Sequence, residues 1–590
     1  MSAKDQIKQI VDYFKREPQL KDKTDGMAEG LMLGAQLADD ANELSKETDA
    51  SFKALQREYT ENGNGSQTTA EITVARDGEL VLDDRLKRDF GNVNAQLAQI
   101  VNVKSFGAVG DGITDDSVAI QAALDHIKEI GGGILVFPYA TYLAAKRLKI
   151  PSNTRIYCFG TIKKAVDPAR EIFRTYNGFD GDGFGGYDAN ENIVIECMNI
   201  DGNNQDVSGI SIGHARNVVI RNVHGVGVGL HLVDLSGVDH ARVENCTNDS
   251  EAVTNANSSA IQIDQAVIGA IGGINADDTP CRNIDIISNI IKNSQASTGS
   301  IQIHRGTIDK PHENINFEGN EMENVRYGII KDTNTFAKNI KLKRNKVNGC
   351  MTGIRLQGSL DGLWIDDNDI EDASDRGIEV RGTANQLVKN VFANGNLIKD
   401  FINHGMSFNF IESFNVASNI VDKKNGNTLT SRGLTFADSR LGIIETNIVT
   451  GADANLTSGI HLQESVEGIT DDIIMNENIV KKADLNYRLV EGERNIMIAH
   501  NEGRKTKNNG LAVLGELYPG ASTTVTIEHG CGTYPAPPKL KDIYITPASS
   551  MGDATEFWVS SIDGPTFTIS IDQPHNVAGG IKFAWKVDVI

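Results

Sequence analysis

The chain has 590 residues, 39% of them hydrophobic and 23% charged, which is enough for several domains with cores of their own. Its formal net charge is −22 and it has no basic cluster, which argues against nucleic acid as a partner. Its six cysteines lack metal-ligand or disulfide spacing, and no apolar run matches a membrane span or a signal peptide, so we expect folding in a cytoplasm without membrane insertion.

Residues 1–66 are predicted to be helical and to serve in attachment or oligomerisation. Small and apolar residues from Leu31 to Leu55 alternate in steps of three and four, as in a heptad seam. Residues 67–100 are predicted to be a linker and a second short helix with the same spacing. Two heptads are too few for an isolated coiled coil. We therefore expect these helices to gather parallel copies of the chain into a homotrimer; the alternative is a helix that caps a monomer.

Residues 101–507 carry a ladder of near-repeats. Apolar triplets that follow Asn or Gly, such as Asn192-Ile-Val-Ile195 and Gly353-Ile-Arg-Leu356, recur, most of them at steps of about 22 to 25 residues. Within each motif the side chains alternate inward and outward at the period of a β-strand. A fixed period with short strands and Asn or Gly at the corners predicts a right-handed, single-stranded parallel β-helix.

The start of this region combines Val101-Asn-Val-Lys-Ser-Phe-Gly-Ala-Val-Gly-Asp-Gly-Ile-Thr-Asp-Asp116 with Gly131-Gly-Gly-Ile-Leu-Val-Phe-Pro138. It resembles the opening of the pectate-lyase-like β-helix superfamily, which includes polygalacturonase-like enzymes and many phage tailspikes. Thr114 is predicted to be the N-cap of a helix that covers the open end of the first coil. The three aspartates of this segment are interpreted as structural rather than catalytic.

Outward positions on successive coils of a β-helix form columns about 4.8 Å apart. One predicted column places Asp264, His304 and Asp332 on consecutive rungs. Two rungs, roughly 9.6 Å, separate the two aspartates, near the upper end of the carboxylate separation in inverting glycosidases. We therefore predict that all three residues are catalytic. The adjacent column is predicted to contain Ser211, His231, Gln262, Gln302, Ile330, Arg355 and Glu379.

Two coils beside these columns are extended by insertions at 265–280 and 305–312, and loops that depart from a regular solenoid often carry function. Two carboxylates with a histidine can supply an acid and a base, or hold a divalent cation. No cofactor is required by the sequence, a divalent cation is possible, and its ligands cannot be assigned. The insertions are predicted to place four further residues beside the column of Asp264 and His304: Asp277 and Asp278 as catalytic residues, and Arg305 and His312 as substrate-binding residues.

A binding groove without chemistry is the alternative for this face. Side chains with several hydrogen-bonding groups would then hold sugar or phosphate groups without cutting the polymer. The residues predicted to bind substrate in either case are Gln262, Gln302, Arg355, Glu379 and Arg381.

Residues 508–590 are predicted to form a small antiparallel β-sandwich, because five strand-like segments are separated by turn-rich stretches. Such a domain could trimerise the protein, bind a sugar or cap the last coil. Of the two tryptophans in these strands, Trp558 and Trp585, core packing is favoured over a sugar platform.

Three segments resemble tailspikes and pre-neck appendages of Bacillus phages and prophages: Ala260-Ile-Gln-Ile-Asp264, Asp277-Asp-Thr-Pro-Cys-Arg-Asn-Ile284 and Ser300-Ile-Gln-Ile-His304. The resemblance implies a component of a virion tail, joined to a tail or baseplate protein through the N-terminal region. It also implies a host cell-wall polymer as partner, such as wall teichoic acid or another surface polysaccharide. We expect depolymerisation by hydrolysis, with a lyase reaction as an alternative. Ile303-His-Arg-Gly306 departs from the Gly-His-Gly of polygalacturonases, which argues against pectin.

Overall fold

The computed structural model describes most of residues 99–588, with gaps at 167–169, 250–257, 295–298, 424–430, 452–455, 466–468, 484, 489–495, 500, 502–506, 515–522, 529–538 and shorter ones beyond. Before residue 99 it describes short helical pieces within 46–57 and 85–91. Most of the predicted N-terminal helical region and linker therefore lies outside the described residues. None of the described helices is long and apolar enough to cross a membrane.

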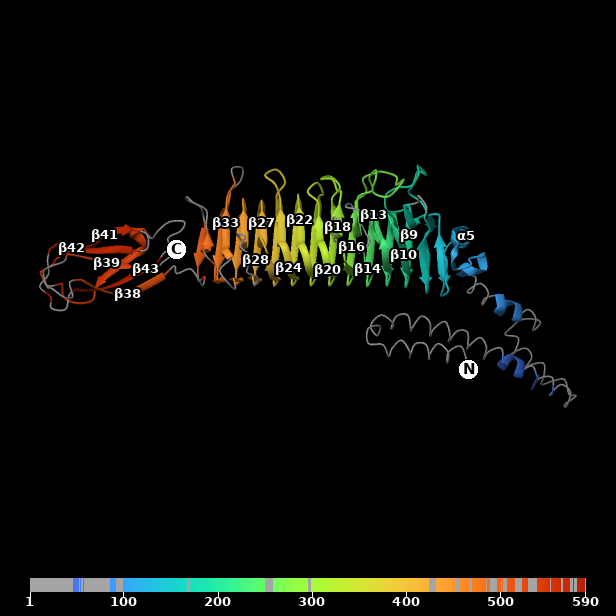
Figure 1. The fold of residues 1–590 in the computed structure, drawn as a ribbon, viewed down its shortest axis with the longest axis horizontal. Coiled ribbons are helices and arrows are strands. Elements are labelled where there is room, and N and C mark those ends of the chain that lie inside the picture. The colour runs from blue at the N-terminus through green and yellow to red at the C-terminus, as the bar shows by residue number, and fades with distance from the viewer. Residues whose placement is uncertain are drawn as a thin grey trace.

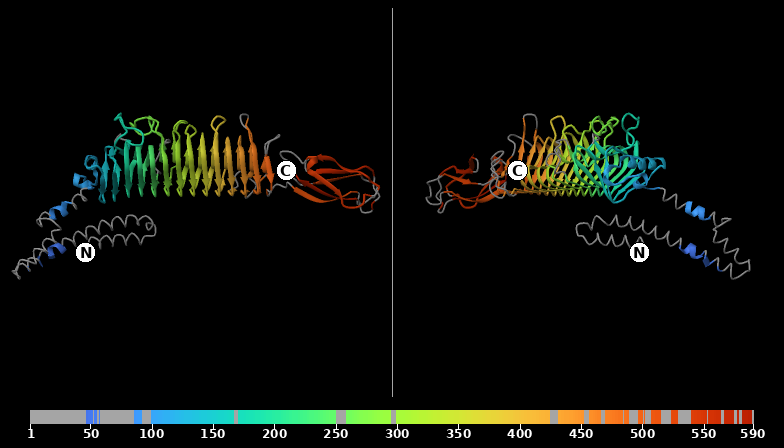
Figure 2. Two further views of the ribbon diagram at one scale, coloured as in Figure 1. Left: turned by 180° about the vertical axis from the view of Figure 1, so that it is seen from behind. Right: turned by 45° about the vertical axis from the view of Figure 1, so that its right-hand side comes forward.

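A helix closes the first coil of a long, straight solenoid (Figures 1 and 2). Helix α5 (Ser117–Glu129) packs Ile120, Leu124 and Ile127 against the core of this coil. The predicted cap was wrong, because Thr114 bonds to Asp111 and the helix begins after Asp116. The structural role of the aspartates is confirmed, since they accept backbone amides, as Asp116 does from residues 109 and 110. The first elements are β1 (Ile100–Asn102), η1 (Val103–Phe106) and β2 (Asp111–Asp115).

The solenoid is a right-handed parallel β-helix, as the repeats predict, and its strands form three stacks. Stack 1 contains β5 (Leu148–Ile150), β8 (Glu171–Thr175), β11 (Ser208–Arg221), β13 (Val233–Glu244), β15 (Ser259–Asp264), β18 (Gly299–His304), β20 (Glu321–Lys331), β22 (Lys346–Gln357), β24 (Asp369–Arg381), β27 (His404–Asn409), β30 (Ser431–Ala437), β33 (Leu456–Gln463) and β36 (Leu485–Arg488). The longest of these strands bend at a corner and continue in another stack.

Stack 2 follows around the coil, and its inward side chains belong to the same hydrophobic core as those of stack 1. It contains β1, β3 (Gly133–Phe137), β6 (Thr154–Cys158), β9 (Asn190–Glu196), the second halves of β11 and β13, β16 (Arg282–Ile287), β19 (His312–Glu318), β21 (Ala337–Lys343), β23 (Leu360–Asp366), β25 (Val388–Asn394), β28 (Ile411–Ala417), β31 (Arg440–Glu445), β34 (Asp471–Asn476) and β37 (Ile496–Ala499).

Stack 3 completes each coil. It contains β2, β4 (Thr141–Ala144), β7 (Thr161–Lys164), β10 (Asn199–Gln205), β12 (His224–Val228), β14 (Thr247–Asp249), β17 (Ile290–Lys292), the first halves of β20, β22 and β24, β26 (Leu397–Phe401), β29 (Ile420–Lys423), β32 (Ile448–Gly451) and β35 (Ile479–Lys481). Every pairing in the three stacks is parallel, so residues at one position in successive coils lie above one another.

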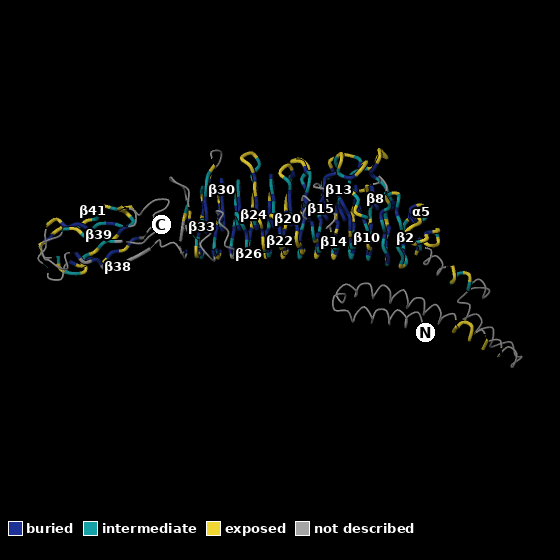
Figure 3. Tube along the Cα trace, in the orientation of Figure 1, coloured by how far each residue is buried: buried dark blue, intermediate teal, exposed yellow. Residues whose placement is uncertain are grey.

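The core is a column of aliphatic and aromatic side chains along the solenoid axis, and exposed residues lie on its surface and loops (Figure 3). At the corner between stacks 2 and 3 a ladder of buried asparagines runs along the axis. Each side chain bonds to the next asparagine and to a backbone carbonyl of the preceding coil, which satisfies buried polar groups and fixes the spacing of the rungs. Its members include Asn289, Asn320, Asn345, Asn368, Asn396, Asn419, Asn447, Asn478 and Asn501.

The C-terminal part consists of two antiparallel sheets with a common core that is separate from the solenoid core. Trp585 is buried in this core and packs edge-on against Phe567, whereas Trp558 is exposed. The elements are β38 (Lys507–Leu514), β43 (Ile581–Asp588) and β40 (Ile543–Pro547) in one sheet, β39 (Thr524–Glu528), β42 (Thr566–Ile571) and β41 (Phe557–Asp563) in the other, and η2 (Leu540–Asp542).

Candidate active site

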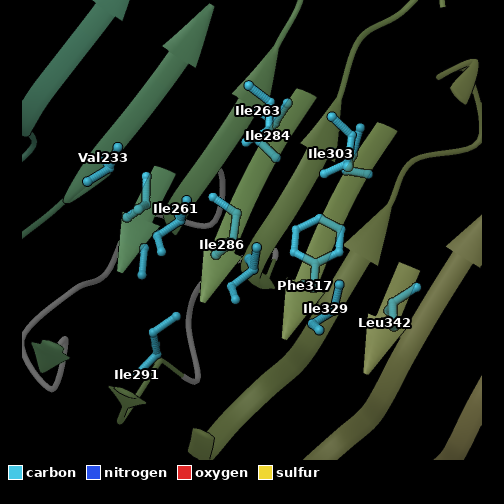
Figure 4. Close-up of a cluster of buried hydrophobic side chains, with 14 of the residues drawn as sticks. Val233, Ile261, Ile263, Ile284, Ile286, Ile291, Ile303, Phe317, Ile329 and Leu342 are labelled. Carbon is cyan, nitrogen blue, oxygen red and sulfur yellow. The ribbon is translucent and has the colours of Figure 1, made fainter. Parts of the chain in front are cut away.

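The outer surface of stack 1 carries the candidate site, on strands β15, β18 and β20. Ile261 and Ile263 of β15 and Ile303 of β18 point into the core (Figure 4). Because side chains alternate along a strand, the residues between and after these isoleucines point outward. The strand register sets Gln262 beside Gln302 and Asp264 beside His304.

The imidazole of His304 lies between two carboxylates. Its Nδ1 is 3.5 Å from Oδ2 of Asp264, and its Nε2 is 3.5 Å from Oδ2 of Asp332. These contacts are ion-pair distances, longer than direct hydrogen bonds. The three residues come from consecutive rungs, in the predicted column. We call Asp264, His304 and Asp332 the triad.

The three residues of the triad differ in their access to solvent. The side chain of Asp264 is 0% exposed, against 29% for His304 and 38% for Asp332. The ring of His304 occupies the space between the carboxylates, so the pair cannot hold a water between them as inverting glycosidases do. This corrects the prediction that Asp264 is a catalytic acid or base that meets the polymer. Asp264 instead lies buried beside the imidazole, at ion-pair distance from its Nδ1, and His304 and Asp332 are the groups a substrate can reach.

The two glutamines of the adjacent column hold the carboxylates in place. Nε2 of Gln262 donates to Asp264 over 3.1 Å, and Nε2 of Gln302 donates to Asp332 over 3.0 Å. Both glutamines are buried, with 6% and 4% of their surface exposed. The prediction that they bind substrate was therefore wrong, because their amides donate to the carboxylates of the triad.

A further acid lies beneath this face, and the sequence analysis missed it. Asp234 of β13, not His231, pairs with Gln262. Burial, with the negative charges of Asp264 and Glu171, raises the pKa of Asp234 well above its ordinary value. His231 lies at the preceding corner, where burial lowers its pKa to about 4. The alternation in Val233-Asp-Leu-Ser236 was the signal that could have revealed Asp234.

Arg305 and His312 have different roles. The guanidinium of Arg305 is partly exposed and lies 3.9 Å from Oδ2 of Asp264, so a substrate can reach it. His312 is buried, its Nδ1 accepting from the amide of Cys281 while its Nε2 lies 2.6 Å from the Arg305 carbonyl. It thus holds the backbone at Arg305, which has a left-handed φ of 51°. The prediction that His312 binds substrate was wrong. Gly306 leaves room for this ring, since a Cβ there would lie 2.9 Å from it.

Among the described residues, no hydrogen bond or ion pair joins the carboxylate of Asp277 or Asp278 to the triad. The carboxylate of Asp277 accepts from the amides of Gly186 and Thr279, which lowers its pKa despite partial burial. It thereby joins the 265–280 insertion to a loop from an earlier coil. Asp278 is exposed and has a left-handed φ of 58°. The catalytic role predicted for Asp277 is corrected to a structural role in the loop, whereas the role predicted for Asp278 stays a prediction.

On the next rungs, β22 and β24, the side chains of a second cluster of polar residues are paired with one another. Glu379 is buried and takes Arg355, Gln357 and Arg376 as partners. Glu379 and Arg355 therefore neutralise each other rather than offering free groups, which corrects their predicted roles in substrate binding, whereas Arg381 is exposed.

Lys331 supports the segment that carries Asp332. Its buried ammonium donates to the carbonyls of Thr335 and Gln357, and burial lowers its pKa to about 7. The loop after β20 is thereby tied to the following coil.

No group of three or more His, Cys, Asp or Glu in the described residues is arranged to hold a metal ion. The divalent cation considered from the sequence stays a prediction.

Comparison with known proteins shows that parts of this chain are similar to pectate-lyase-like β-helix proteins, to phage appendage proteins and to an epimerase. Residues 100–224 match a family model described as rhamnogalacturonase A/epimerase, pectate lyase-like, and residues 287–477 match one described as periplasmic copper-binding protein (NosD). The preneck appendage protein of Bacillus phage PZA is 34% identical over 158 residues, which cover 24% of this chain and 17% of that protein. A mannuronan C5-epimerase, AlgE2 of Azotobacter vinelandii, is 34% identical over 122 residues, covering 18% and 11%.

A solved structure is similar over most of the chain. The tailspike protein of Escherichia coli bacteriophage HK620, in a complex with a hexasaccharide, aligns with a TM-score of 0.53 over 84% of this chain and 95% of that one, at 13% identity. At this identity the likeness is one of fold. The sequence matches span a small part of their curated relatives, so the activity of those proteins is not established for this chain.

Proposed function

From the premise of a tailspike-type, pectate-lyase-like β-helix, we propose that this protein is a phage tail component that binds a surface polysaccharide of its host and cuts it by hydrolysis. The single observation that carries the chemical part is His304, whose ring lies between a buried and an exposed carboxylate. The relatives named above support the biological part, since they include a phage appendage and an enzyme that acts on a polysaccharide.

The proposed reaction uses the two accessible residues of the triad. Water attacks the carbon or phosphorus of the linkage, one of His304 and Asp332 accepts its proton, and the other donates a proton to the leaving oxygen as that bond breaks. Asp264 orients the imidazole and stabilises its cationic form, as a buried carboxylate behind a histidine does in other hydrolases. Arg305 faces the same space and would stabilise negative charge on the reacting group.

The polymer that we propose is wall teichoic acid or another surface polysaccharide of a Gram-positive cell. The support is the likeness to the Bacillus phage appendage and the arginine beside the triad, which suits a phosphate or a carboxylate. In this proposal the chain is made in the host cytoplasm, joins the virion tail through its N-terminal region and acts at the host surface.

A parallel homotrimer is proposed on the basis of an apolar column on stack 2. Phe392, Ile443, Ile474 and Met497 lie in one register column, with Asn415 between the first two. These four apolar residues are 37%, 37%, 41% and 53% exposed. An exposed column made mostly of apolar residues on a single chain is typical of a surface that other subunits cover.

The test compares fragment release from purified wall teichoic acid and capsular glycan by mass spectrometry. The wild-type protein should release fragments that have gained water, whereas an unsaturated end would show elimination instead. His304→Ala and Asp332→Asn should each lower the rate by about 100-fold or more. The matched control is His240→Ala, an exposed histidine at the start of the stack 2 part of β13. Equal fragment release by wild type and both triad variants would overturn the proposed site.

A non-catalytic adhesin is the second candidate, favoured by the complete burial of Asp264 and the saturation of Glu379. Binding to purified cell walls with no fragment released over hours would select it.

A further inference from the structure

A second group of basic side chains lies on stack 1, towards the C-terminal end of the solenoid. His461 of β33 pairs in register with Thr435 of β30 on one side and with Arg488 of β36 on the other. Arg432 lies three residues before Thr435 and pairs with His404. All of these side chains come from one outward surface, within four neighbouring rungs.

Within the described part of the chain, Arg432 and Arg488 lack the carboxylate partners that other arginines on the solenoid have. Arg344 and Arg440, for example, each form an ion pair with a glutamate of the neighbouring strand or turn. Among the residues that the structure describes, no carboxylate lies within ion-pair distance of Arg432 or Arg488. Along this column the next carboxylate, Glu379, is two rungs from Thr435 and already takes three donors.

One buried polar atom points to a ligand site. His461 is 4% exposed, yet its Nδ1 has no hydrogen-bond partner, which is costly for a buried polar group. Nδ1 of His404 bonds to the Thr435 hydroxyl over 3.0 Å. Burial and the nearby arginines hold the pKa of both histidines at about 3. An anion placed here would give His461 a partner and relieve the repulsion between the two guanidinium groups.

We propose that Arg432, Arg488 and His461 form a binding subsite for an anionic group, a phosphate or a carboxylate, of the polymer. Four rungs separate Asp332 on β20 from Arg432 on β30, a distance of about 19 Å. Several units of an extended chain fit this span, so one polymer can reach both the subsite and the triad. The inference rests on the proposed function for its ligand and implies that the substrate is a polyanion.

The local positive charge of this surface determines how an anionic polymer interacts with it at short range. The whole chain carries a net charge of −22, which repels a polyanion at long range. At physiological ionic strength such repulsion is screened within about 8 Å. Two unpaired guanidinium groups on the binding surface therefore decide whether an anionic unit is attracted once it is close.

The experiment measures binding by isothermal titration calorimetry with the full chain and three probes: glycerol-phosphate oligomers, oligogalacturonate and neutral dextran oligomers. Arg432→Gln/Arg488→Gln should weaken binding of at least one anionic probe by about tenfold or more. The matched control, Arg344→Gln/Arg440→Gln, removes the same charge from outside stack 1 and should leave affinity unchanged. Loss with the phosphate probe alone identifies a phosphate ligand, and loss with the uronate alone identifies a carboxylate.

A second readout does not depend on cleavage. Binding of the anionic probe should raise the pKa of His461, seen as a shift in its imidazole NMR titration. Equal affinity of wild type and Arg432→Gln/Arg488→Gln for every probe, or tighter binding of dextran than of either anion, would overturn the subsite. A protein that releases no fragments but loses anion binding in this double variant refutes the depolymerase and leaves the subsite standing.

Discussion

Replacing Asn320 with alanine tests the asparagine ladder that keeps the rungs of the site in register. Asn320 is fully buried in the coil that joins His304 to Asp332. Its Nδ2 donates to the carbonyl of Ile286 and to Oδ1 of Asn345, each over 2.9 Å. Its Oδ1 accepts from the backbone and side-chain nitrogens of Asn289, over 3.0 and 2.9 Å.

The cost of this substitution follows from these four hydrogen bonds. A typical internal hydrogen bond contributes about 0.5–1.5 kcal/mol net, so Asn320→Ala should lower the free energy of unfolding by about 2–6 kcal/mol. The upper part of this range is expected because the partners of Asn320 stay buried, and the alanine side chain offers no donor or acceptor to replace the lost hydrogen bonds. The matched control is Asn316→Ala on the neighbouring strand, whose amide donates to Asp285 and Glu318 at a partly exposed position. That change should cost less than about 1 kcal/mol.

The assay is unfolding in guanidinium chloride followed by far-ultraviolet circular dichroism, with recovery of the signal on dilution as the check on reversibility. A loss in Asn320→Ala no greater than that in Asn316→Ala would refute the reasoning that the buried ladder stabilises the coil.

Three further outcomes are expected. Asp234→Asn should raise the melting temperature at pH 8 and leave it unchanged near pH 4. The pKa of the wild-type carboxyl is raised in the folded state, so as the pH rises above about 4 the unfolded chain loses this proton first and the folded state loses stability. His461→Gln should flatten the loss of stability on acidification from pH 6.5 to about 3, measured without added anion, because the unfolded histidine binds a proton in this window and the folded one does not. Ile443→Asp/Ile474→Asp should shift the assembly towards monomer in analytical ultracentrifugation, whereas Ile308→Asp in an exposed loop should not; an unchanged mass would contradict the proposed trimer surface.

The repeats in the sequence were sufficient for the fold and for the main column of the site. Parallel stacking converts a spacing along the chain into a position on the surface. The sequence alone could therefore place Asp264, His304 and Asp332 in one column. One error in register shows the limit. Gly229-Leu-His-Leu232 fits the strand motif, yet β13 begins at Val233, because residues 229–232 form a corner.

Burial and loop contacts were decided by the tertiary structure alone. Asp264 and Asp332 occupy equivalent positions in the repeat, so the sequence does not distinguish them. The packing of neighbouring coils buries Asp264 and leaves Asp332 exposed to solvent. Likewise, Asp277 is bound by Gly186, which lies far away along the chain. Local alternation determines which way a side chain points, since that is a property of one strand. What it meets there depends on coils and insertions distant in sequence, and only the folded chain brings them together.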